Sequence, residues 1–174
     1  MKKWIGMICS FIAGACGFIF LCLDCWTQKA TAYVAGVSTT TTKSVNGWDL
    51  IKNDSEINGL VLYKIFAIAL LAVSVLLIIS ALVLLLRNLK VLKTTLNIDA
   101  INKILLLLFA ICAIVMMIAL GVMSKDVSVD NVQEIAGVKV GAKLSAYAGI
   151  GSWLNLGVGI LAFAFGCLAK GKSK

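Results

Sequence analysis

The sequence offers few residues for chemistry, and the clearest are two cysteines. Cys22 and Cys25 form a C-x-x-C pair, and such a pair can exchange thiol and disulfide because one sulfur attacks the mixed disulfide of the other. Asp24 lies between them and disfavours the thiolate that exchange requires. A thiol–disulfide oxidoreductase is therefore one interpretation, and a local disulfide or two free thiols at a helix end is the simpler one.

Other catalytic chemistry lacks its residues. The chain has no histidine, which removes the usual general base and the commonest metal ligand together. It has no Gly-rich phosphate loop, and one C-x-x-C supplies only two metal ligands. We therefore expect a protein that is not an enzyme and that holds no metal and no cofactor.

The apolar residues come in long blocks. The chain is 61% hydrophobic with a mean hydropathy of +1.02, and a helix needs about 20 apolar residues to cross about 30 Å of hydrocarbon. We predict one domain, 1–174, which is an all-α four-helix transmembrane bundle. Its spans are residues 4–23, 65–86, 104–123 and 144–169, joined by loops 24–64, 87–103 and 124–143. The first block could instead be a signal peptide, because 13–16 resembles a lipoprotein cleavage box.

The charges orient these spans. Of 16 basic and eight acidic residues, nine basic residues and only Asp99 lie before the first span, in loop 87–103 or after the fourth span. Dense Lys and Arg in short loops mark the cytoplasmic side. We expect a multi-pass protein of the cell membrane with both ends cytoplasmic. The net charge of +8 fits this topology, so we expect no nucleic acid partner.

Small residues predict how the helices pack, because they let backbones approach within lipid. The fourth span carries a heptad stripe, typical of left-handed crossing: Ser145, Ala148, Ser152, Asn155, Gly159, Ala162, Gly166 and Ala169. The first span carries a similar one with Gly6, Ala13, Gly14 and Gly17. We expect these two spans to pack together, although the stripe of the fourth could face another subunit. The third span has no stripe and is expected to face lipid most.

Asn155 is the one strongly polar side chain deep in a predicted span. It can form an interhelical hydrogen bond worth about 0.6–2 kcal/mol, or line the pore of an oligomeric channel. The predicted spans contain no ionisable Asp, Glu, Lys or Arg, which argues against ion-coupled transport.

The two outer loops favour strands. Residues 32–42, 127–129 and 138–140 are rich in Val and Thr, which are enriched in strands. We predict a small extracellular β-sheet to which both loops contribute. Trp26 is expected at the membrane interface, and Trp48 in the base of the sheet. Both are candidates for outer-loop interactions.

Trp26, Gly47-Trp48 and Arg87 support a resemblance. With four spans and a long first outer loop, the chain resembles the claudin and peripheral myelin protein superfamily. It also looks like uncharacterised small bacterial four-span proteins with a Gly-Trp in that loop. The claudin-type pattern has a Leu between Gly and Trp and two loop cysteines, which are missing here. The resemblance implies adhesion or self-assembly through the outer sheet, but the missing disulfide counts against adhesion.

The sequence therefore predicts a non-enzymatic membrane protein that acts in assembly or scaffolding. Its outer loops and small-residue helix faces would mediate self-association or binding of a membrane protein partner within the lipid bilayer. An oligomeric channel and a thiol–disulfide oxidoreductase are the alternatives.

Overall fold

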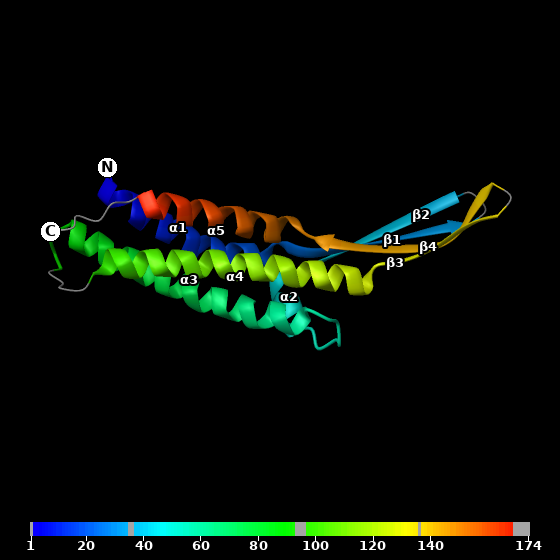
Figure 1. Cartoon of the computed structure of the whole chain (residues 1–174), viewed down its shortest axis with the longest axis horizontal. Coiled ribbons are helices and arrows are strands. Elements are labelled where there is room, and N and C mark those ends of the chain that lie inside the picture. The colour runs from blue at the N-terminus through cyan, green and yellow to red at the C-terminus, as the bar shows by residue number, and fades with distance from the viewer. Residues whose placement is uncertain (1, 35–36, 93–96, 136, 169–174) are drawn as a thin grey trace.

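Four long helices lie side by side, and a β-sheet projects from one end of them (Figure 1). The computed structural model describes residues 2–34, 37–92, 97–135 and 137–168. The long helices are α1 (Lys2–Cys22), α3 (Leu60–Asn88), α4 (Ile98–Val127) and α5 (Ile150–Leu168). Each is long and apolar enough to cross a membrane by length and composition. These helices form a bundle, and the end that carries the sheet is called its sheet end below.

The sheet has four antiparallel strands in the order β2-β1-β4-β3. They are β1 (Asp24–Val34), β2 (Val37–Asn46), β3 (Val129–Ile135) and β4 (Val138–Ala148). Both loops contribute two strands, so the prediction of a small sheet built from both loops is confirmed. The short helix α2 (Gly47–Lys52) follows β2, and the Asn46 side chain caps it by accepting from the Asp49 N–H at 2.8 Å.

The predicted start of the fourth span is wrong. Ser145 and Ala148 lie on β4, and α5 begins only at Ile150. β4 stays hydrogen-bonded to β1 up to the start of α5, because the Gly149 N–H donates to the Cys25 carbonyl at 2.7 Å. A Cβ at Gly149 would collide with the Asp24 backbone, so the close approach of β1 requires glycine there. Small residues fit a helix seam and a tightly paired strand equally well, and the long-range pairing decides between them.

The predicted contact between the first and fourth spans is confirmed, but its detail is wrong. α1 contacts α5 and α3, and α4 contacts α3 and α5. Gly14 and Gly17 of α1 face α3 rather than the small residues of α5. A Cβ at Gly14 would lie 2.8 Å from the Ser74 carbonyl oxygen of α3. The positions of Gly159 and Gly166 instead face Phe109 and Leu106 of α4.

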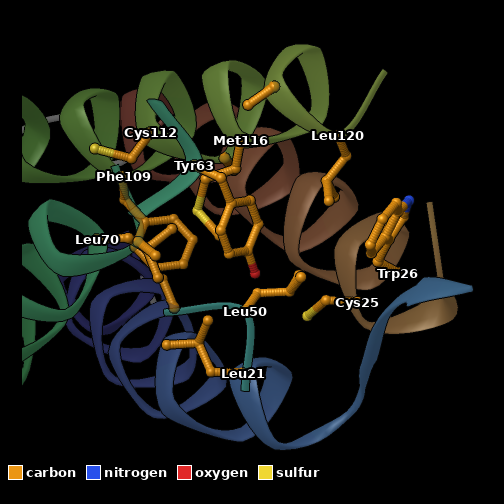
Figure 2. Packing of buried hydrophobic residues seen from close by; sticks show 14 of the residues in the cluster. Leu21, Cys25, Trp26, Leu50, Tyr63, Leu70, Phe109, Cys112, Met116 and Leu120 are labelled. Atoms are coloured by element: carbon orange, nitrogen blue, oxygen red, sulfur yellow. The ribbon is translucent and has the colours of Figure 1, made fainter. Parts of the chain in front are cut away.

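α4 is the most buried of the four helices, so the expectation that the third span faces lipid most is wrong. Its large side chains fill the centre of the bundle, among them Phe109, Met116 and Leu120 (Figure 2). Small residues on α1, α3 and α5 let the backbones of these helices lie close to the centre of the bundle. α4 has no small-residue stripe, and its large side chains fill that centre. Apolar contact in lipid gains from such dispersion packing rather than from leaving water.

The close approach of α1 to α3 gives a stability prediction. A Gly17→Ala change places a Cβ against the Ser74 side chain and 3.0 Å from Phe109, and overpacking of this kind costs about 1–3 kcal/mol. Gly157→Ala is the matched control, because nothing lies within 4 Å of that Cβ. Thermal unfolding of the full chain in mild detergent should show a lower melting temperature for Gly17→Ala only. Equal melting temperatures would contradict the packing described.

Candidate functional site

The C-x-x-C cysteines lie in different surroundings. Cys22 is exposed at the end of α1, where its Sγ accepts from Trp48 Nε1 at 3.4 Å. Cys25 is 2% exposed, and its thiol donates to the Phe20 carbonyl at 3.3 Å. Burial raises the pKa of the Cys25 thiol, which keeps it protonated and a poor nucleophile. Both thiols are free, and this arrangement provides no accessible, activated pair.

Thiol labelling of the native protein tests this placement. Cys22 should react with a maleimide in mild detergent, whereas Cys25 should react only after denaturation, because it is buried and its pKa is raised. Mass spectrometry of the peptides separates the two sites. A Cys22–Cys25 disulfide that forms with mild oxidant and is reversed by reductant would instead favour the oxidoreductase.

Two buried asparagines differ in their partners. Asn155 on α5 is 4% exposed inside the bundle, and its Oδ1 has no hydrogen-bond partner among the described residues. Its side chain therefore lies within its own bundle. Asn102 on α4 is 3% exposed, and its Oδ1 accepts from Ser10 at 2.7 Å and from Ser80 at 2.8 Å. This polar cluster joins α1, α3 and α4.

The sequence prediction missed Asn102 because it placed this residue in loop 87–103. The available signal was Asn97, whose side chain accepts from Ala100 N–H at 3.3 Å and caps α4. Asparagine is a preferred N-cap residue, and a helix that begins there brings Asn102 inside the bundle. The nearby ion pair of Arg87 and Asp99, at 2.9 Å, links the ends of α3 and α4.

Replacement by leucine should lower the stability more at Asn102 than at Asn155. Asn102→Leu leaves the buried Ser80 hydroxyl without its acceptor, which costs about 1–3 kcal/mol, whereas the Ser10 hydroxyl keeps the Gly6 carbonyl at 2.8 Å as an acceptor. Asn155→Leu removes an amide oxygen that has no partner, so its cost should be smaller. Thermal unfolding of both variants in the same detergent measures the difference. A larger loss for Asn155→Leu would show that its amide has a role that the contacts do not reveal.

Trp26 and Trp48, two of the four tryptophans of the chain, both pack against the core. Trp26 is 2% exposed, and its Nε1 donates to Ser124 Oγ of α4 at 3.3 Å. The expectation that Trp26 serves an outer-loop interaction is therefore wrong, because its ring is buried where the base of the sheet meets α4. Trp48 is half-buried against the core and keeps a partly exposed ring.

The sheet has one apolar and one polar face. Successive side chains alternate between the two faces of a strand, and the pairing places one set from each strand together. We call the following set the apolar face: Gln28, Ala30, Ala32, Val34, Val37, Thr39, Thr41, Lys43, Val129, Asn131, Gln133, Ile135, Val138, Val140, Ala142, Leu144 and Ala146. Lys43 is its single charged residue. The opposite, polar face carries Lys29, Lys139, Lys143, Asp130 and Glu134 among threonines and serines.

The apolar face continues the core of the bundle and then runs beyond it. At the base, Val45, Ala146 and Ala148 pack against the buried cluster. Farther out, no described residue covers the face, and its side chains are exposed: Val34 and Val37 at 68%, Ile135 at 61% and Val140 at 42%. In Figure 1 the strands extend well past the helix ends.

A shallow hollow of about 270 Å³ lies on this face. Ala30, Ala32 and Ala142 on the two central strands line its floor, and Thr41 and Val129 on the edge strands line its sides.

The polar face carries a charge pair. Lys143 Nζ lies 2.6 Å from Asp130 Oδ2, and both side chains are solvent-exposed. The hydrogen bond from Lys143 lowers the pKa of Asp130, and the same bond raises the pKa of Lys143. Exposed pairs of this kind stabilise a protein little. The pair is informative for another reason: its charges indicate that this face of the sheet is exposed to water.

No protein-family model matches the chain, and no curated protein matches it. Among the described residues, no group of three or more His, Cys, Asp and Glu could hold a metal ion. The apolar face of the sheet is therefore the strongest candidate for a functional site.

Proposed function

We propose that this chain is a multi-pass membrane assembly protein that binds a protein partner on the apolar face of its sheet. The partner is a second copy or another membrane protein. The sheet would stand outside the cell, and both chain ends would lie in the cytoplasm, because short segments at the other end of the bundle hold Arg87, Lys90 and Lys103.

The uncovered apolar face is the observation that carries this proposal. Monomeric soluble domains rarely expose a contiguous apolar patch larger than a few hundred Å², and a sheet with one apolar face is normally covered by a second layer. Here six aliphatic side chains of that face are at least 39% exposed: Val34, Val37, Val129, Ile135, Val138 and Val140.

Protein covers such a face better than lipid does. The two edge strands β2 and β3 each pair on one side only, and hydrocarbon does not tolerate the unpaired backbone groups of an open sheet edge. Lys29 and Lys143 on the polar face also require water or a counter-charge. A protein partner buries the apolar face while the lysines stay hydrated and the edge backbone groups remain free to bind water or another strand.

The bundle itself offers less for assembly than its sequence suggested. Gly14 and Gly17 pack against α3, and Gly159 and Gly166 pack against α4. The small-residue faces are thus used within one molecule, which leaves the sheet as the main assembly surface. Asn155 also lies inside its own bundle, so the arrangement favours assembly over an oligomeric channel.

The chain would also share the layout of claudin-type proteins, with four spans and a long first outer loop. Trp26 supports the sheet from below, and Gly47 begins α2 where a Cβ would lie 3.1 Å from the Tyr63 hydroxyl. Trp26 and Gly47, which belong to the motif that resembles the claudin type, therefore both have a packing role at the base of the sheet. A shared architecture would require such a role.

A pair of lysine substitutions tests the proposed surface. Val140 on the apolar face and Tyr147 on the polar face lie on the same strand and are 42% and 48% exposed. Val140→Lys should release the partner from protein purified in mild detergent, because it places a charge in an apolar interface. Tyr147→Lys should retain the partner. Native mass spectrometry reads both outcomes.

The wild-type chain provides the reference. It should carry at least one bound protein, and crosslinking in intact membranes before extraction should preserve that complex. A wild-type chain that stays a bare monomer after such crosslinking would refute the proposed function.

A further inference from the structure

The free edges of the sheet are open to another strand. β2 has ten residues and β3 has seven, and almost all of their side chains are exposed. Natural sheets protect their edges with proline, charges, bulges or short strands. β2 is long compared with the usual five to six residues, the chain has no proline, and residues 37–42 carry no charge.

The two edges run in opposite directions. β1 follows α1 away from the bundle, and β2 returns toward α2. β3 follows α4 away from the bundle, and β4 returns to α5. The edge strand β2 therefore points toward the bundle and the other edge strand β3 points away from it.

We propose that a second copy in the same membrane adds its β3 to β2, head to tail, and continues the antiparallel sheet. This inference rests on the proposed function: it makes a second copy the edge neighbour and leaves the apolar face available to the bound protein. All copies in one membrane share one orientation, so β2 of one copy and β3 of the next are antiparallel. Two β2 strands in one membrane would instead be parallel, and an antiparallel β2–β2 pair would need facing membranes.

The dimensions of the two layers agree with this pairing. Four strands at about 4.8 Å spacing repeat every ~19 Å. Below them, α1 leads into β1 and β4 leads into α5, and these two helices are neighbours. Two packed helices span about 16–20 Å. The α1–α5 pair is therefore about as wide as the repeat of the continued sheet.

The side chains at the two edges are compatible. Thr39 and Thr41 of β2 would meet Asn131 and Gln133 of β3 on the apolar face, and all four are uncharged. Their hydroxyl and amide groups can hydrogen-bond across strands. The apolar faces of neighbouring copies then lie on one side, and this interface is heterologous, so it closes into a ring when the rotation between copies allows.

Disulfide crosslinking between two tagged copies tests the pairing in native membranes. Both copies carry Cys22→Ser, because Cys22 is the exposed native thiol beside the sheet. One copy carries Thr39→Cys or Thr41→Cys and the other carries Asn131→Cys or Gln133→Cys, so that four combinations cover the register. At least one β2–β3 combination should crosslink about tenfold more than the same-site β2–β2 controls. The absence of every β2–β3 crosslink, or equal β2–β2 yields, would overturn the edge pairing.

A charge at the edge supplies the second measurement. Thr40 on β2 and Thr31 on β1 face each other with hydroxyls 3.2 Å apart, so lysine at either position removes the same contact. Thr40→Lys charges the free edge and should lower the β2–β3 crosslink by about fivefold or more. Thr31→Lys charges an interior strand and should leave the yield near that of the parent. Equal losses would show that the edge is not the interface.

The outcomes separate the two proposals. Copies that co-purify without any β2–β3 crosslink would reject the edge pairing and keep assembly through the apolar face. A chain that is monomeric in membrane crosslinking would reject both.

Discussion

The pairing of β1 with β4 joins segments that lie far apart in the sequence, and most features of the sheet end depend on it. The ladder runs from Trp26 opposite Ala148 to Tyr33 opposite Gly141. At its base, Ser152 Oγ donates to the Cys25 carbonyl at 3.0 Å, so the ladder passes directly into α5. Backbone groups at the membrane boundary lose water and must find partners within the protein, and this ladder supplies them.

That pairing also determines what the sheet can do. It fixes the register, and the register places most of the alanines and valines on one face and most of the lysines on the other. A shift of one residue would exchange these faces. It also leaves β2 and β3 as the edges and gives them opposite directions. The proposed binding face and the proposed edge pairing are therefore two consequences of one set of hydrogen bonds.

Much of the fold could be predicted because its causes are local. Long charge-free blocks predicted four helices, and Val- and Thr-rich segments predicted strands. Three features depend on distant partners and could not be predicted. Ser145 joins a strand only because β1 lies beside it, Trp26 is buried only because α4 reaches under the sheet, and α4 fills the core because its neighbours carry the glycines. Small residues show where backbones approach, but not which large side chain enters.

Hydrogen exchange at the sheet edges tests the central claim that copies of the chain assemble through the edges of the sheet. Backbone amides of β2 and β3 that point away from their strand neighbours exchange freely in an isolated sheet and slowly in a paired one. The assembled protein in native membranes should protect these edge amides, and monomer in detergent should lose that protection while β1 and β4 keep theirs. Edge amides that exchange equally fast in membranes and in the monomer would contradict the account.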